Sequence, residues 1–344
     1  MNAVPALAVV EAPHECNGAE RCGVAGGLLT SLANRPLLWH ILDRLSEAGI
    51  ETAAIVADAR LRDRVQTVAG TSTAPALKVE FLDPGDRRSP QEPLDRLKRW
   101  AGLQPVLLHP GDRLFLSALP RLCECFAQTE ADLAVLPPAP AHDPVPISGI
   151  QRAVPLPAGT AAIAAPAAWP ALEALAGGPI TVSGLLDAAV AVGAHVVRCE
   201  AGEQWHYSDR TAQLLAANRM ILDRMAPGAP PSAASEPRSE VHGLVAIDET
   251  ARVSGSSLAG PSVVGAGAVL SDSFIGPYTA IGDGATVVGA EVQNAIVLAG
   301  AEIRHPGVRV EGSVIGEAAL VTRSFGFPTG LHLHVGPRAQ VIIG

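Results

Sequence analysis

Short apolar runs rich in β-branched residues alternate with helical patterns along residues 1–225. The clearest helical pattern is residues 36–49, where the apolar positions form one stripe, Pro36 suits a first turn and Gly49 suits an end. Alternation of this kind predicts an α/β layer with a mainly parallel sheet. The predicted strands are residues 7–10, 52–57, 76–82, 105–108 and 132–136, and the last predicted helix is residues 208–225.

The hydrophobic period changes after residues 226–240, a stretch of Pro, Ser and Ala that we interpret as a linker. Beyond it, aliphatic residues recur at six-residue steps, with one shift in phase. That period fits stacked triangular coils, each hexapeptide turning one aliphatic side chain inward; the alternative is a β-sandwich with coincidental spacing. We therefore predict domains at residues 1–225 and 241–344. The residues predicted to point inward are Val263, Val269, Ile275, Ile281, Val287, Val297, Ile303, Ile315 and Val321.

Composition and charge narrow the class of protein. The 34 Gly and 29 Pro disfavour long helical bundles. A net charge of −9, with Lys78 and Lys98 as the only lysines, disfavours nucleic acid and anionic membranes as partners. No apolar run approaches the roughly 20 residues that span a bilayer, and the N-terminus lacks the basic segment of a secretory signal. Five unevenly spaced cysteines fit reduced thiols, so we expect a cytoplasmic protein.

Four segments together carry a family resemblance: NRPLLWHILDRLSEAGI, HPGDRLF, LLAANRMIL and the repeat SFIGPYTAIGDGATV. They resemble sugar-1-phosphate nucleotidyltransferases, most of all the long-form glucose-1-phosphate thymidylyltransferases. The resemblance implies a Rossmann-like, GT-A-like nucleotidyltransferase domain followed by a left-handed parallel β-helix. It also implies a reaction in which a sugar phosphate oxygen attacks the α-phosphorus of a nucleoside triphosphate and pyrophosphate leaves, aided by a divalent metal.

The phosphate-binding motifs of that family are altered in this sequence. Counting back from Asn34, the family's Pro-Lys pair falls on Gly26 and Gly27, which form either a substitute cradle or a simple loop. The glycine-rich loop positions hold residues 11–15, whose two carboxylates and proline have the wrong charge and too few N–H donors for phosphates. The sugar-phosphate lysine is also missing, and Arg152 is the remaining cation there, with a different donor geometry.

The metal-binding motifs are half retained. Gly111 and Asp112 match the family's Gly-Asp pair, so Asp112 is the candidate ligand for Mg²⁺ if the protein is active. The alternative role of Asp112 is a helix or turn cap ahead of residues 114–126. Tyr207 falls on the position of the second metal carboxylate, and a neutral phenol is a poor Mg²⁺ ligand. The substrate loop corresponds to residues 93–97, where bulky charged residues replace small ones.

Three hypotheses follow. The loss of one preorganised electrostatic contact costs on the order of 10²- to 10³-fold in rate, and at least three are altered, so we expect activity reduced by roughly 10⁴ or more. The favoured hypothesis is a pseudoenzyme that binds a nucleotide or sugar nucleotide, or acts as a regulatory subunit in a homo-oligomer or with an active paralogue. The alternatives are a divergent active enzyme and a β-helix acyltransferase using His332 or His334. No catalytic residue is assigned, and the candidate pocket comprises Gly26, Gly27, Gly111, Asp112, Arg152 and Tyr207.

Overall fold

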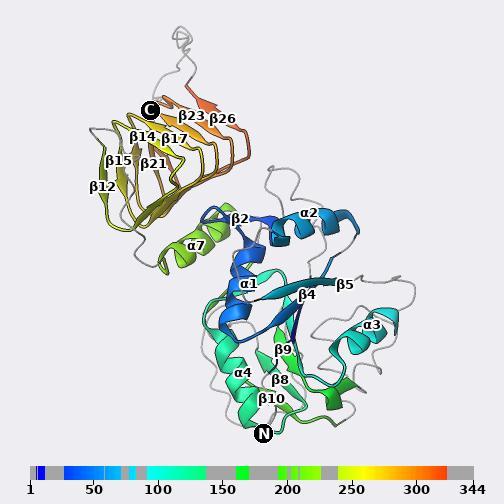
Figure 1. Cartoon of the computed structure of the whole chain (residues 1–344). Helices are drawn as coiled ribbons and strands as arrows, with labels where there is room; N and C mark the ends of the chain where they lie inside the picture. The colour runs from blue at the N-terminus through cyan, green and yellow to red at the C-terminus, as the bar shows by residue number, and fades with distance from the viewer. Residues whose placement is uncertain are drawn as a thin grey trace, which may run out of the picture.

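The computed structural model of the chain combines an α/β unit with a stack of short parallel strands (Figure 1). This arrangement confirms the predicted fold class of an α/β domain followed by a β-helix. Residues 226–238 of the predicted linker lie outside the described residues. The structure describes residues 5, 7–11, 27–57, 59–70, 77–82, 91–136, 160–169, 193–199, 203–207, 210–225 and 239–323.

The α/β unit is built on a seven-stranded sheet in the order β10-β8-β9-β6-β1-β4-β5. Its strands run parallel except β9, which is antiparallel to both neighbours. The central strands are buried on both faces, which explains why they read as continuous apolar runs. The five strands predicted from sequence are present as β1, β4, β5, β6 and β8. The bounds are β1 (Leu7–Glu11), β4 (Thr52–Val56), β5 (Lys78–Leu82), β6 (Val106–Pro110), β8 (Leu133–Leu136), β9 (Ala161–Ala164) and β10 (Val196–Arg198).

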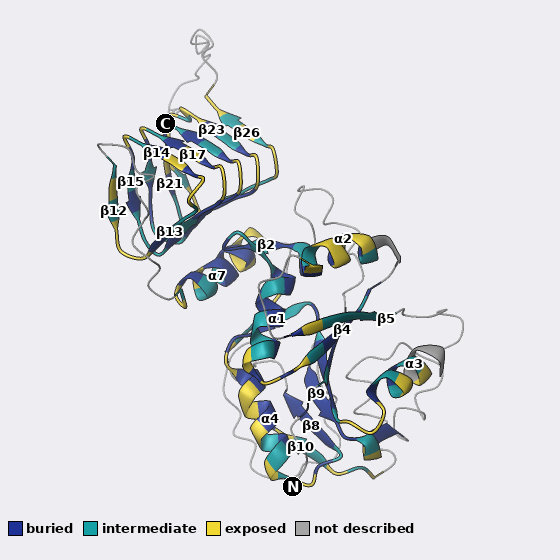
Figure 2. Cartoon of the chain, viewed as in Figure 1, coloured by how far each residue is buried: buried dark blue, intermediate teal, exposed yellow. Residues whose placement is uncertain are grey.

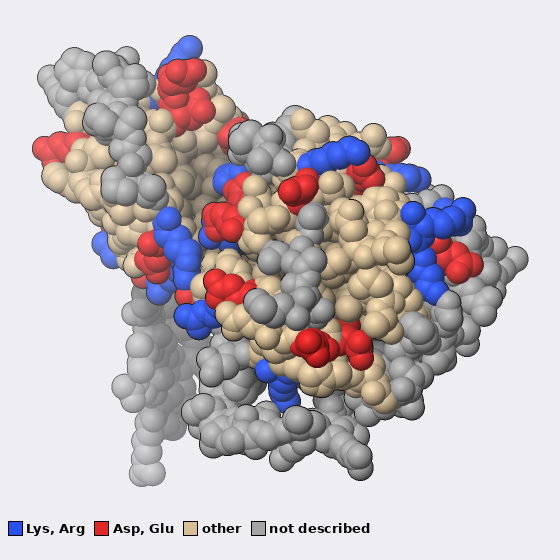
Figure 3. Space-filling view, turned by 60° about the horizontal axis from the view of Figure 1, so that its bottom comes forward, with Lys and Arg blue, Asp and Glu red and all other residues tan. Residues whose placement is uncertain are grey.

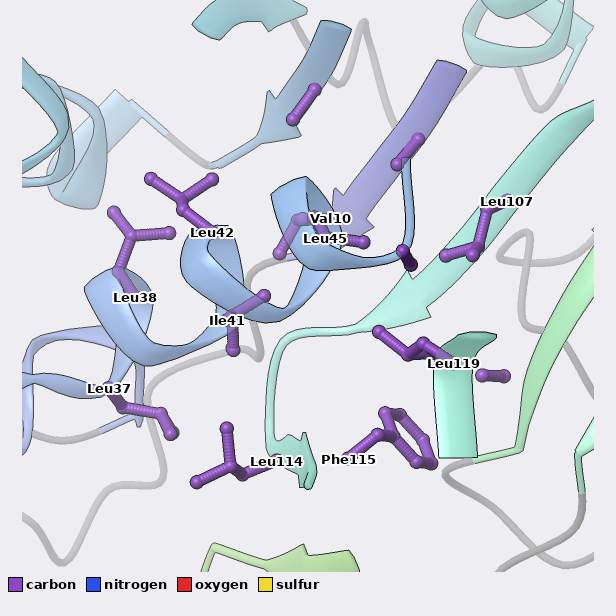
Figure 4. Close-up of a cluster of buried hydrophobic side chains, with 14 of the residues drawn as sticks. Val10, Leu37, Leu38, Ile41, Leu42, Leu45, Leu107, Leu114, Phe115 and Leu119 are labelled. Carbon is purple, nitrogen blue, oxygen red and sulfur yellow. The ribbon is translucent and has the colours of Figure 1, made fainter. Parts of the chain in front are cut away.

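Helices cover both faces of this sheet. The apolar stripes of α1 (Leu37–Glu47), α2 (Ala59–Gly70) and α4 (Ala118–Gln128) pack in one core, whereas α3 (Gln91–Ala101) packs in a second core on the opposite face. Figure 2 shows the buried residues concentrated between these layers. The stripe predicted for residues 36–49 is confirmed. Its side chains belong to the same buried cluster as Val10, Leu107 and Leu119 (Figure 4): Leu37, Leu38, Ile41, Leu42 and Leu45.

The C-terminal strands form three parallel sheets of five strands each, wound as a β-helix. At least one inward side chain from every strand belongs to a column of aliphatic residues along the axis or packs against it. The strand bounds are β12 (Glu240–His242), β13 (Val245–Ile247), β14 (Arg252–Ser254), β15 (Ser257–Ala259), β16 (Ser262–Val264), β17 (Val269–Ser271), β18 (Phe274–Ile275), β19 (Thr279–Ile281), β20 (Thr286–Val288), β21 (Glu291–Gln293), β22 (Ile296–Val297), β23 (Glu302–Arg304), β24 (Val310–Glu311), β25 (Val314–Ile315) and β26 (Leu320–Thr322).

The predicted phase of this repeat is wrong at its first two positions. Val269 is 36% exposed, and its neighbour Leu270 is buried in the column instead. In the same way, Val264 rather than Val263 is the buried residue of its strand. The reason is that equivalent residues such as Ser254 and Ser271 stack 17 positions apart, so one side of the coil is shorter than a hexapeptide. Counting strictly in steps of six residues therefore selects residues that point out of the coil. The other predicted inward residues, from Ile275 to Val321, belong to the column or pack against it.

The β-helix docks on the α/β unit through α7 (Thr211–Leu222) and a short hairpin of β2 (Ser31–Leu32) and β3 (Arg35–Pro36). Asn218 of α7 is 1% exposed and joins all three parts. Its Oδ1 accepts a hydrogen bond from the Ala33 N–H at 2.9 Å, and its Nδ2 donates to the Tyr278 carbonyl at 3.0 Å. Ile296 and Leu298 of the β-helix complete the core of the α/β unit. The two parts are therefore joined by a buried interface.

We expect Asn218→Ala to lower the free energy of unfolding by about 1–3 kcal/mol, because it leaves a buried N–H and a partly buried carbonyl without partners. Urea unfolding measures this loss. The control is Gln213→Ala on the exposed face of the same helix, which should change stability by less than about 0.5 kcal/mol. Equal effects of the two substitutions would show that Asn218 does not hold the interface.

The surface carries charges of both signs. In Figure 3 the Lys and Arg side chains lie among Asp and Glu side chains, so this face presents no broad field of one sign. Several are paired, including Arg35 with Asp43 at 2.9 Å. Among the described helices, none is long and apolar enough to cross a membrane.

Candidate functional site

The candidate site lies where the order of the sheet reverses. β1 is flanked by β4, the next sheet strand along the chain, and by β6, which returns on its other side. In open α/β sheets, ligands bind at the carboxyl ends of the strands beside such a reversal. Glu11 ends β1 opposite Pro110, which ends β6, so the loops after both strands leave from one edge. Gly111 and Asp112 follow directly at this edge.

A two-stranded antiparallel ribbon holds the residues that follow β6. It pairs β7 (Arg113–Phe115) with β11 (Gln204–His206), so Arg113 faces His206. The pairing extends by one position, because the Tyr207 N–H donates to the Asp112 carbonyl at 2.7 Å. Backbone hydrogen bonds thus bring the predicted site residues Gly111, Asp112 and Tyr207 to one place.

The Asp112 carboxylate is the chemical centre of this site. Its Oδ2 lies 3.2 Å from His206 Nε2, within hydrogen-bond distance, and its Oδ1 is buried without a hydrogen-bond partner. Of the two alternatives, a helix or a turn cap, the helix cap at Asp112 is wrong, because β7 intervenes and α4 begins only at Ala118. Asp112 lies instead in the turn between β6 and β7. The neighbouring Arg113 has a pKa lowered by burial, and the Asp112 charge opposes this shift.

A second unusual group lies beneath the turn. His109 of β6 is 2% exposed, and neither of its ring nitrogens has a hydrogen-bond partner. Its ring meets the Phe115 ring edge to face at 5.1 Å. Burial lowers the pKa of His109 to about 3, while the nearby Pro110 carbonyl offsets part of the shift. His109 is therefore neutral at physiological pH.

The described residues do not fit a Mg²⁺ ion. Mg²⁺ is bound through carboxylate and other oxygen donors in octahedral geometry. Asp112 supplies one carboxylate, already contacted by His206, and Tyr207 supplies a phenol where the second carboxylate is expected. Within the described part of the chain, no three His, Cys, Asp or Glu side chains group closely enough to hold a metal.

Gly27 belongs to a different local structure. It is buried with φ +63, begins the short helix η2 (Gly27–Leu29) and accepts a hydrogen bond from the Thr30 N–H at 3.1 Å. That φ is readily adopted by glycine. η2 packs against α1 and α2, so the structure gives Gly27 a role in supporting these helices. Gly26 and Arg152 lie outside the described residues.

Three other predictions are placed as follows. The expected substrate loop, residues 93–97, lies within helix α3, where Leu97 is buried in the second core. Asp209, which follows Tyr207 by two positions and is a suitable residue type for a helix cap, lies outside the described residues, as do His332 and His334.

Sequence reasoning did not identify His206 or His109 as site residues. The signal for His206 was its place between Trp205 and Tyr207, next to the expected metal position. Only the pairing of β7 with β11 shows that it reaches Asp112. His109 gave no signal, because a single histidine at the end of an apolar strand is compatible with ordinary packing.

No protein-family profile matches the chain. Similarity to individual proteins is extensive in length and low in identity. A glucose-1-phosphate thymidylyltransferase of Streptomyces antibioticus is 25% identical over 92% of this chain and 93% of its own length. A protein of the same name from Streptomyces griseus is 24% identical over 91% of this chain and 93% of its own length. The low-salt glycan biosynthesis nucleotidyltransferase Agl11 of Haloferax volcanii is 23% identical over 91% of this chain and 93% of its own length.

Proposed function

We propose that this chain is a catalytically impaired member of the sugar-1-phosphate nucleotidyltransferase family and that it acts by binding a ligand. Similarity over nine-tenths of its length supports the family membership. The ligand class is a nucleotide or a nucleotide sugar, as the names of its relatives suggest. The reaction those names describe joins a nucleotidyl group to a sugar 1-phosphate. In this proposal the protein keeps the fold that binds the ligand and has lost most of its catalytic activity.

The observation that carries the proposal is the pairing at Asp112. The carboxylate that would hold the divalent metal is contacted by His206 Nε2 at 3.2 Å. The family resemblance implies a second carboxylate at the position of Tyr207, whose N–H donates to the Asp112 carbonyl. Phosphoryl-type transfer depends on cations that stabilise a highly charged transition state. Lys78 lies on the edge strand β5 and Lys98 lies on α3, away from the turn that holds Asp112.

Thermal unfolding with ligands tests the binding half of this proposal. Thymidine triphosphate and thymidine diphosphate glucose, each with EDTA or with Mg²⁺, should raise the melting temperature of the full chain. A ligand at 100 times its dissociation constant stabilises the native state by about 2.7 kcal/mol. We expect stabilisation that does not require Mg²⁺. A panel of nucleotides and nucleotide sugars that leaves the melting temperature unchanged would contradict ligand binding.

A divergent active enzyme is the second candidate. Retention of Gly111 and Asp112, together with full-length similarity to proteins named as transferases, favours it. Such an enzyme would use Asp112 and Arg152 on nucleoside triphosphate and sugar 1-phosphate. Mg²⁺-dependent release of pyrophosphate would support it over the pseudoenzyme. Acyl-CoA binding would instead support the β-helix acyltransferase hypothesis.

Assembly is the other part of the proposal. A regulatory subunit acts through a partner, so we propose either a homo-oligomer or a hetero-oligomer with an active paralogue. Light scattering of the isolated chain distinguishes the first arrangement, and co-purification with a tagged active paralogue tests the second.

A further inference from the structure

A group of thiols lies where helix α4 packs on one end of the seven-stranded sheet. α4 contacts β8 and β9, and β10 lies beside β8 as the edge strand (Figure 1). Cys123 and Cys125 belong to α4, and Cys199 directly follows β10. Cys123 and Cys199 are buried in the core that α4 helps to form, and Cys125 is partly exposed at its margin. Two segments far apart in the sequence therefore bring cysteines to one side of the sheet.

The alternation of side chains along β10 explains why Cys199 faces α4. Val196 pairs with Leu133, and the Cys199 N–H donates to the Val135 carbonyl at 2.8 Å, so the pairing with β8 continues through Cys199. Val196 and Leu133 pack in the second core, on the side of α3. Successive side chains of a strand point to opposite faces of the sheet. Cys199, three positions after Val196, therefore points to the face that α4 covers.

Within this group, Cys125 and Cys199 form a pair. Burial raises the pKa of the Cys199 thiol, and a hydrogen bond between its side chain and Cys125 raises this pKa further. The backbone of Cys125 is also held, because its carbonyl accepts a hydrogen bond from the Thr129 hydroxyl at 3.0 Å. Cys123 is a weaker, electrostatic neighbour of Cys199, and burial raises its own pKa to about 11.

We infer that Cys125 and Cys199 are a redox-active pair that closes to a reversible disulfide when the protein meets a low-molecular-weight disulfide such as oxidised glutathione. The thiolate of Cys125, the more accessible of the two, attacks one sulfur of the oxidant, and one glutathione leaves. The Cys199 thiolate then attacks the Cys125 sulfur of this mixed disulfide and displaces the second glutathione. The two cysteine protons pass to the two departing thiolates, and the oxidant gains the two electrons that the pair loses.

The resting state of this pair is the dithiol. The thiolate is the form that attacks a disulfide, and a buried, protonated Cys199 supplies little of it. Closure therefore needs an oxidant that has already reacted at Cys125, which places the second sulfur next to Cys199. Disulfides of this kind are transient and sense the redox state where the surroundings keep thiols reduced.

The disulfide joins the two segments from which the ribbon of the candidate site extends. β7 leads into α4, which carries Cys125, and Cys199 precedes β11. Because β7 and β11 pair with each other, the new bond gives both strands a common covalent anchor. The inference goes beyond the proposed ligand binding and does not depend on it.

The test uses the full chain, reduced, freed of reductant and incubated with oxidised glutathione. Remaining thiols are alkylated, and unreduced peptides are mapped by mass spectrometry. Trypsin is combined with a glutamate-specific protease, because cleavage after Glu124 separates Cys123 from Cys125. We expect one peptide pair that joins Cys125 to Cys199 as the main product at these positions and disappears on treatment with dithiothreitol.

Variants separate the two steps of the reaction. Cys199→Ala should stop with glutathione bound to Cys125, because the second attacking thiol is gone, and Cys125→Ala should leave Cys199 as a thiol. Cys123→Ala is the matched control on the same helix and should form the cross-link as the native chain does. Cys199→Ser replaces Cys199→Ala if that variant fails to fold, and the map of the native chain requires no variant.

Three results would each overturn the inference. They are recovery of Cys125 and Cys199 as alkylated thiols after oxidation, a native chain that stops at the mixed disulfide, and a cross-link from either residue to another cysteine. Cys16 and Cys22 lie outside the described residues and are read on their own peptides. No nucleotide is present, so failure of ligand binding and failure of disulfide formation are read separately.

Discussion

Tyr207→Asp is expected to give this protein a Mg²⁺-dependent rise in melting temperature that the native chain lacks. Tyr207 lies opposite Asp112 in the β7–β11 pairing, joined by its N–H to the Asp112 carbonyl. Residues opposite each other in antiparallel strands have Cβ atoms about 4.5–5.5 Å apart. A carboxylate at this position therefore adds a second oxygen donor beside Asp112, and Mg²⁺ is bound through one or two carboxylates.

The expected effect has two parts. Without metal, two neighbouring carboxylates repel each other and the variant should be less stable than the native chain. With Mg²⁺ at 100 times its dissociation constant, the variant should gain about 2.7 kcal/mol. Tyr207→Asn removes the same ring without adding charge and should show no Mg²⁺ response. A Mg²⁺ response in the native chain, or an equal one in Tyr207→Asn, would refute the account of a lost metal carboxylate.

His109→Leu is expected to stabilise the protein and to reduce its sensitivity to acid. Both ring nitrogens of His109 are buried without hydrogen-bond partners. Replacing an unsatisfied buried polar group by an apolar one of similar size removes its desolvation penalty, about 1–3 kcal/mol at neutral pH. Urea unfolding of the native chain and the variant at pH 7 measures this gain.

The pH dependence follows from the lowered pKa. The pKa of His109 is about 3 in the folded state against 6.5 when unperturbed, because burial disfavours the charged form. Below pH 6.5 the unfolded chain binds a proton that the folded chain does not, so stability falls as pH drops towards 3. The loss amounts to on the order of 5 kcal/mol over that window. This contribution of His109 should be absent in His109→Leu and present in the control His242→Gln.

His40 also makes the stability of the protein depend on pH in the acid range, including in His109→Leu. Burial lowers the pKa of His40 to about 4, although the Leu32 carbonyl opposes the shift, so part of the acid dependence remains in the variant. An acid profile identical to that of the native chain would mean that His109 is hydrated or protonated in the folded state.

The sequence predicted the layers of the fold because apolar periodicity reports directly on burial. The stripe of residues 36–49 and the five predicted strands correspond to elements of the structure. The repeat was recognised as a β-helix, yet its phase failed at Val263 and Val269. A coil side of five rather than six residues, as between Leu270 and Ile275, leaves no local signal in composition.

The site could be predicted only in part. Asp112 and Tyr207 were found because the resemblance fixed their positions, and the β7–β11 pairing brings them together. The contact between Asp112 and His206 spans 94 positions in the sequence, and no local pattern encodes it. The sequence left Gly27 open between a substitute phosphate cradle and a simple loop, and in the structure it begins η2.

The sheet reversal and the β7–β11 ribbon present a turn at the edge where ligands bind in open α/β sheets. At this turn the Asp112 carboxylate contacts the His206 imidazole.

The rate of pyrophosphate release shows whether catalysis by this protein is impaired. Purified full-length chain is incubated with thymidine triphosphate, glucose 1-phosphate and Mg²⁺, and pyrophosphate release is followed over time. We predict a rate that is lower than that of an ordinary enzyme of this kind by roughly 10⁴-fold or more. Turnover of about 1 per second or faster, the usual range for enzymes, would contradict it.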